Sequence, residues 1–98
     1  MARVTVFSGE YDVANRPELR KKLDRLAFES DVILDFTRVT FVDSTCIAEL
    51  IRLDDLRDAN ELGRMTVLVG GNSAIHRLFE ILGLGDRFSV EVKETIAV

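Results

Sequence analysis

The residues that could do chemistry are few and widely spaced. His76 is the single histidine and Cys46 the single cysteine. His76 is expected on a helix with no cysteine or carboxylate at metal-ligand spacing, and a nucleophilic Cys46 would need a histidine base folded against it. We therefore predict no catalytic residue, no metal site and no cofactor. His76 is interpreted as structural, and Cys46 as partly buried and chemically quiet.

Asp43, Ser44 and Thr45 are the most informative polar residues, because they join a short apolar strand ending at Val42 to a helix. Their side-chain oxygens can accept the amide hydrogens that a first helical turn leaves unpaired, so the simplest interpretation is a helix cap. The stretch Gly70-Gly71-Asn72-Ser73 also leads into a helix. It lacks the lysine and the spacing of a phosphate-binding loop, and we interpret it as a turn with a cap.

The hydrophobic pattern alternates between strand and helix along the chain. Strands are expected at 3–7, 31–35, 65–69 and 88–92, with helices between them that start near residue 15, at Ser44 and after Ser73. Such an order predicts an α/β domain whose parallel strands are joined by right-handed crossovers.

Several details of these elements can be predicted as well. Ser8-Gly9 should end the first strand in a turn, and 31–35 should be the central strand, covered on both faces. Gly63 should end the second helix in a left-handed conformation, and Gly83 should stop the third. The basic residues of the first helix should form a solvated face: Arg20, Lys21, Lys22 and Arg25.

The composition limits the function classes. A chain of 98 residues with 47% hydrophobic content predicts one domain, residues 1–98. The net charge of −4 argues against direct nucleic-acid binding, which normally needs a basic face. No apolar stretch approaches the roughly 20 residues of a membrane span, and no signal peptide is recognised. The cytoplasm is therefore the expected compartment.

Several stretches together resemble the STAS domain family, in particular the bacterial anti-sigma factor antagonists. Asp35-Phe36-Thr37, Val39, Phe41-Val42 and Asp43-Ser44-Thr45 resemble the family's central signature, and Gly9-Glu10-Tyr11-Asp12 resembles its Gly-Glu-Leu/Ile-Asp turn. Val67-Leu68-Val69 and 77–84 resemble its next strand and last well-marked helix. The resemblance implies a mostly parallel four-stranded sheet with about three helices. It also implies that the family's first strand and last helix are missing or reduced, and Cys46 stands where the family usually has glycine.

The resemblance also implies a function. Family antagonists bind an anti-sigma factor that is also a serine kinase, and they are switched off when that kinase phosphorylates the serine after the aspartate. Carried over, the acceptor is Ser44, and the partner-binding residues are Glu10, Asp12, Asp43, Ser44 and Thr45. Two alternatives remain: a STAS scaffold subunit of a larger signalling or transport assembly, and a small enzyme or ligand carrier. The possibility that the protein forms a homodimer also remains open.

Overall fold

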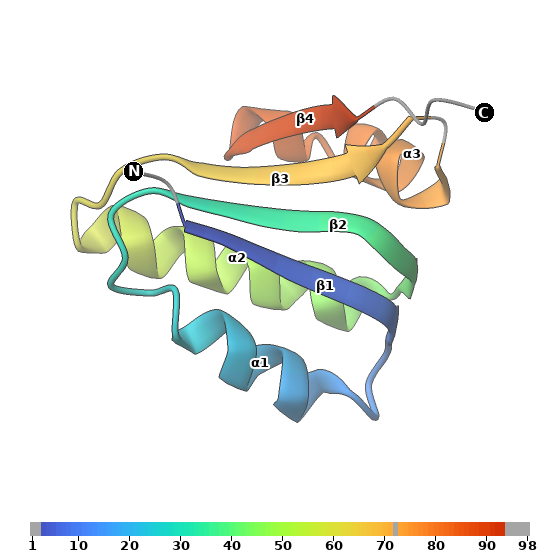
Figure 1. Cartoon of the computed structure of the whole chain (residues 1–98), viewed down its shortest axis with the longest axis horizontal. Helices are drawn as coiled ribbons and strands as arrows, with labels where there is room; N and C mark the ends of the chain where they lie inside the picture. Colours follow the sequence, from blue (N-terminus) through green and yellow to red (C-terminus); the bar gives the residue numbers. More distant parts are fainter. Residues whose placement is uncertain (1–2, 72, 94–98) are drawn as a thin grey trace.

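A computed structural model describes residues 3–71 and 73–93. Four strands alternate with three α-helices, and a short 3-10 helix precedes the last strand, as Figure 1 shows. The elements in chain order are β1 (Arg3–Tyr11), α1 (Arg16–Asp24), β2 (Val32–Val42), α2 (Ser44–Ala59), β3 (Met65–Gly70), α3 (Ala74–Ile81), η1 (Leu84–Asp86) and β4 (Ser89–Lys93). The predicted α/β fold is confirmed. Residues 94–98, where a closing helix was expected to be reduced, lie outside the described part.

The four strands form one sheet in the order β1-β2-β3-β4, and each neighbouring pair is parallel. Right-handed crossovers that always step in the same direction place every connecting helix on one face of the sheet. Figure 1 accordingly shows α2 running behind β1 and β2. The buried core lies between this face and the helices, and includes Phe7, Leu34, Val67, Leu50 and Phe79.

The prediction that the strand at 31–35 is covered on both faces was wrong. In β2 the buried residues Val32, Leu34 and Phe36 alternate with the half-buried Ile33 and Asp35. The strand also continues without a break to Val42, so the two apolar runs seen in the sequence are one strand of 11 residues. It is nevertheless an inner strand, because it pairs with both β1 and β3.

The predicted turn at Ser8-Gly9, which the family resemblance extends to Asp12, was wrong for most of its length. β1 stays paired with β2 as far as Tyr11, with register shifts between Val6 and Ser8 and between Gly9 and Glu10. Gly9 has a φ of +84°, a value that glycine adopts without a steric penalty. Both register shifts leave an extra residue on β2, which therefore bulges opposite this part of β1, and the turn begins at Asp12.

The two glycines expected to stop helices behave differently. Gly83, with a φ of 66°, follows α3 in the left-handed conformation and confirms the predicted stop. Gly63 does not, because α2 ends at Ala59 and the left-handed residue after it is Glu61, with a φ of 54°. Gly63 instead allows a close approach, since a Cβ there would lie 1.9 Å from Oδ1 of Asp31.

Candidate functional site

The pairing of β1 with β2 brings the two predicted halves of the site together. Glu10 and Tyr11 lie opposite Phe41 and Val42, and the amide of Asp43 donates to the Tyr11 carbonyl at 3.2 Å. The carboxyl ends of both strands lie on the same side of the sheet, and Figure 1 shows α2 beginning there. The segments 10–12 and 43–45, more than 30 residues apart in sequence, therefore form one surface. The partner-binding roles given to these residues remain predictions.

Asp43 caps α2, as predicted. Its Oδ1 accepts the amide hydrogens of Thr45 at 2.9 Å and Cys46 at 3.2 Å. The backbone of Asp43 is extended, with a φ of −107°, which is the usual conformation of an N-cap. The carboxylate also sits at the positive end of the helix dipole. Ser44 is thus the first residue of a helix whose start is already capped by its neighbour.

Ser44 and Thr45 differ in accessibility. Ser44 is exposed, whereas Thr45 is half-buried. Because Asp43 supplies the cap, the hydroxyl of Ser44 is not needed to satisfy these two amides. An exposed hydroxyl at a helix N-terminus can carry a phosphate whose charge the helix end favours.

The first half of the site is a compact turn organised by Asp12. Its Oδ1 accepts the amide hydrogens of Ala14 at 2.9 Å and Asn15 at 3.2 Å. The side chain of Asn15 then donates to the carbonyl of Glu10 at 2.9 Å. Asp12 therefore shapes the backbone between β1 and α1, while the carboxylate of Glu10 is exposed beside the start of α2.

Two exposed apolar residues, which sequence reasoning did not assign to the site, lie close to these segments in the sequence. Phe41, 48% exposed, pairs with Glu10 at the end of β2, and Val13, 68% exposed, follows Asp12 in the turn. The sequence places Phe41 in an apolar strand and in the stretch that resembles the family signature, but gives it no role in partner binding. Its exposure depends on which face of the bulged strand it occupies, and local sequence does not give that.

Cys46 is 2% exposed, which confirms the predicted burial. Burial, followed by the nearby charges of Asp43 and Glu49, raises the pKa of its thiol to about 12. A thiol with this pKa forms almost no thiolate near neutral pH, and the thiolate is the reactive form. The side chain fills space behind the capped turn.

A buried carboxylate, that of Glu49 on α2, pairs with two partly exposed arginines of α1, and sequence analysis missed this cluster. Glu49 is 2% exposed, and its carboxylate accepts from Nε of Arg16 at 3.0 Å and from Nε and Nη2 of Arg20 at 3.0 and 2.8 Å. The predicted solvated face holds only in part for Arg20, whose side chain is 41% exposed but paired with Glu49. Hydrogen bonding from Arg20, opposed by burial, lowers the pKa of the Glu49 carboxyl.

We expect Glu49→Gln to lower stability at neutral pH and to leave it almost unchanged in acid. The folded-state pKa of Glu49 lies below that of an unfolded glutamate, about 4.3. Its contribution is therefore present above that value and is lost as pH falls through the folded-state pKa. Urea midpoints of wild type and variant should differ at pH 7 and approach each other as the pH is lowered through the folded-state pKa of Glu49. A gap that stays constant with pH would contradict this assignment.

The remaining titratable groups form no catalytic arrangement in the part of the chain that the structure describes. Nε2 of His76 lies 3.0 Å from Oε1 of Glu80, one turn further along α3. These two residues line a cavity of about 340 Å³ together with Phe79, Asp86 and Val90. Across residues 3–71 and 73–93, no group of three His, Cys, Asp or Glu side chains could hold a metal ion. Within the same ranges no helix is long and apolar enough to cross a membrane.

The arrangement of a parallel sheet, one helical layer and a capped Asp-Ser-Thr helix start matches a known family. A family model for the STAS domain matches residues 2–97. The chain belongs to the STAS domain family. No curated protein sequence matches this STAS domain.

Solved structures share the fold of this STAS domain. An anti-sigma factor antagonist from Mycobacterium paratuberculosis has a TM-score of 0.74 at 22% identity, covering 92% of this chain and 76% of that one. The anti-sigma factor antagonist SpoIIAA in its unphosphorylated form has a TM-score of 0.65 at 21% identity, covering 96% and 80%. A sulfate transporter family protein from Wolinella succinogenes has a TM-score of 0.57 at 20% identity, covering 93% and 77%.

Proposed function

We propose that this STAS domain is an anti-sigma factor antagonist that is switched off by phosphorylation of Ser44. The observation that carries the proposal is the place of Ser44, exposed at the start of α2, directly after the Asp43 cap and beside the end of β1. Two of the similar structures are anti-sigma factor antagonists, and one of them is described as unphosphorylated. This supports a regulatory binding protein without catalytic activity of its own.

The proposed partner is an anti-sigma factor that is also a serine kinase. By binding it in the cytoplasm, the domain would release the sigma factor and so regulate transcription without touching DNA. The surface around Ser44 suits a protein interface, because exposed apolar groups (Phe41, Val13) stand among carboxylates (Glu10, Asp12). Aromatic side chains surrounded by polar groups are typical anchors of such interfaces.

The phosphate is expected to act on the interface and to leave the fold intact. It adds roughly −1.5 to −2 charge at neutral pH and lies at a helix N-terminus, which favours anions. In the complex, the same charge beside Asp43 would be desolvated against the partner. An unpaired charge in such a place costs several kcal/mol, and about 3 kcal/mol already exceeds a hundredfold in affinity.

Incubation with the cognate kinase and ATP should place phosphate on Ser44 and not on Thr45. Ser44 is exposed, whereas Thr45 is half-buried in the first turn. Mass spectrometry of the digested protein would locate the phosphate. Ser44→Ala should abolish labelling, and Thr45→Ser, which keeps a hydroxyl at that position, should leave it on Ser44. Phosphate on Thr45, or at a distant residue, would overturn the proposed switch.

A second candidate is a STAS subunit of a larger assembly without a sigma-factor switch. The likeness to a sulfate transporter family protein and the cysteine at position 46 favour it. In that case the start of α2 would still bind protein, but no kinase of the source cell would label Ser44. A pull-down from the source cell with wild type and Ser44→Asp separates the two, since only the antagonist loses a kinase partner on substitution.

A further inference from the structure

The outer edge of β1 carries backbone groups that face away from the sheet. β1 pairs with β2 alone among the described strands. The amide of Arg3 donates toward β2, to the carbonyl of Asp31 at 3.0 Å. Because the backbone groups of successive residues in a parallel strand point to opposite sides, Thr5 also faces β2. Val4 and Val6 therefore direct their N–H and C=O groups outward, along the edge.

One of these outward-facing backbone groups, the carbonyl of Val6, already accepts a hydrogen bond from Lys22. Nζ of Lys22 lies 2.5 Å from the carbonyl oxygen of Val6 and 4.4 Å from the centroid of the Phe7 ring. A lysine across an edge strand is one way in which proteins limit uncontrolled strand pairing. Here it also places a positive charge where the backbone of an added strand would run.

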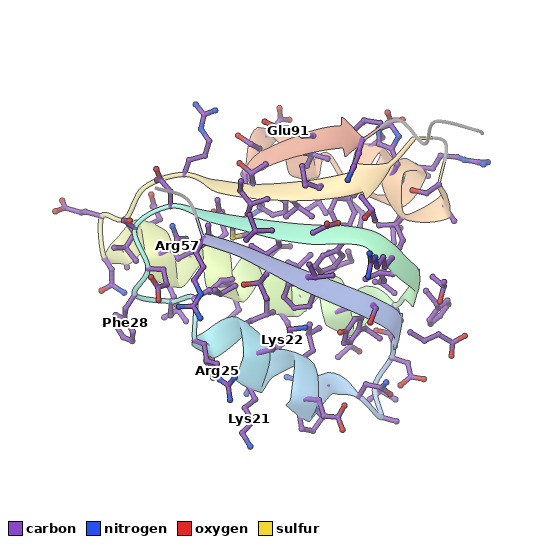
Figure 2. The ribbon with its side chains drawn as sticks, viewed as in Figure 1. Lys21, Lys22, Arg25, Phe28, Arg57 and Glu91 are labelled. Carbon is purple, nitrogen blue, oxygen red and sulfur yellow. The ribbon has the colours of Figure 1, made fainter. Side chains whose placement is uncertain are left out.

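The side chains along this edge are apolar on the open face of the sheet. Val4 is 56% exposed and Val6 is 45% exposed, both on the face that the helices leave uncovered. At the amino end of the strand, Arg3 holds Glu29 in an ion pair of 3.0 Å. The preceding residue, Phe28, is 80% exposed and lies beyond the carboxyl end of α1, at the end of the molecule where β1 begins (Figure 2).

The helix beside the edge is strongly basic. Residues 16–25 contain five basic and two acidic side chains in a chain whose net charge is −4. Arg16 and Arg20 are paired with Glu49, so the basic residues beside the edge are Lys21, Lys22 and Arg25. Figure 2 shows Lys21, Lys22 and Arg25 along α1, on the side of the molecule where β1 forms the edge, with Phe28 close to the end of this row. Lys21 and Arg25 are exposed.

This charge distinguishes between the possible occupants of the edge. Two copies of the chain pairing through β1 would place their α1 helices on the same face of the joined sheet, with like charges opposed. Like charges brought together across an interface disfavour the complex. An acidic strand from another protein would instead be attracted to the basic side chains of α1.

We propose that the β1 edge accepts an extended acidic segment of a partner protein as a fifth strand. The backbone of the segment pairs with Val4 and Val6, in the manner of β-strand addition. Its alternate side chains are acidic toward Lys21, Lys22 and Arg25 and apolar toward Val4 and Val6. Lys22 exchanges the Val6 carbonyl for a partner carboxylate. This site is separate from Ser44, so its test does not depend on the proposed antagonist function.

The test uses a labelled hexapeptide of alternating Glu and Val and a control in which Lys replaces Glu. Fluorescence anisotropy should show binding of the acidic peptide at least about tenfold tighter than of the basic one. Hydrogen exchange followed by NMR should show slower exchange of the Val4 and Val6 amides on binding. The amide of Thr5, which already faces β2, should be unchanged. An acidic peptide whose amides facing β1 are N-methylated cannot donate those hydrogen bonds. It should therefore no longer bind the unaltered protein.

Charge reversal provides the matched comparison. Lys21→Glu with Arg25→Glu should weaken acidic-peptide binding at least about tenfold and favour the basic peptide. Arg87→Glu with Lys93→Glu makes the same change in net charge near β4 and should alter affinity by less than about twofold. Equal effects of the two double variants, binding without protection of Val4 and Val6, or no binding at about 1 mM would overturn the proposal. So would a wild-type dimer, found by sedimentation, that Val6→Lys dissociates.

Discussion

Arg57→Ala is expected to lower the free energy of unfolding by about 3–5 kcal/mol. Arg57 lies on α2 and is 2% exposed, although it is charged. Its guanidinium donates to four backbone carbonyls of two loops, those of Leu26 at 2.8 Å, Glu29 at 2.5 Å, Ser30 at 2.6 Å and Gly63 at 3.1 Å. Alanine would leave a cavity and remove the donor from all four.

Urea denaturation at pH 7 measures this effect. The free energy of unfolding of a small domain is about 5–15 kcal/mol, so the variant should lose a large share of its stability. Arg57→Lys should recover only part of it, because an ammonium cannot reproduce the planar fork of donors. Arg87→Ala, which removes an exposed arginine, should change stability by less than about 0.5 kcal/mol. If Arg57→Ala lowered the free energy of unfolding by less than about 1 kcal/mol, the two loops would not depend on the hydrogen bonds of Arg57.

Ser44→Asp is expected to weaken binding to the cognate kinase at least about a hundredfold while the domain keeps its fold. A carboxylate at the first residue of α2 is favourable for the helix. In the complex it would stand beside Asp43 and lose its hydration against the partner surface. About 3 kcal/mol of such cost corresponds to a loss of more than a hundredfold.

Thermal unfolding and isothermal titration calorimetry separate the two effects. Ser44→Asp should unfold within a few degrees of wild type, since helix-end charges contribute about 0.3–1 kcal/mol. Ser44→Ala should bind nearly as well as wild type, because Asp43 provides the cap hydrogen bonds. If Ser44→Asp bound as tightly as wild type, the interface would not include the start of α2.

The features that sequence could predict are local. The capping of α2 by Asp43 follows from residue types that favour a helix start, and the structure confirms it. The stop at Gly83 and the order of strands and helices rest on signals within a few residues. The prediction that 10–12 and 43–45 belong to one binding surface came from a family pattern and not from any local signal. The register of β1 against β2 places them side by side.

The features that sequence missed depend on contacts between distant elements. Glu49 looks like an ordinary helical glutamate until α1 places two arginines against it. Gly63 suggested a helix stop, but its lack of a side chain serves the approach of Asp31, 32 residues earlier in the chain. Ser8-Gly9 remains in a strand because β1 keeps pairing with β2, which bulges opposite it, and this pairing overrides the local turn preference.

The most direct test of the proposed switch is a calorimetric titration of the cognate kinase with the unphosphorylated protein and with protein phosphorylated only at Ser44. The phosphate should leave the circular dichroism spectrum unchanged and raise the dissociation constant at least about a hundredfold. Equal affinity of the two forms would contradict a switch at Ser44 and would leave this STAS domain as a binding module under some other control.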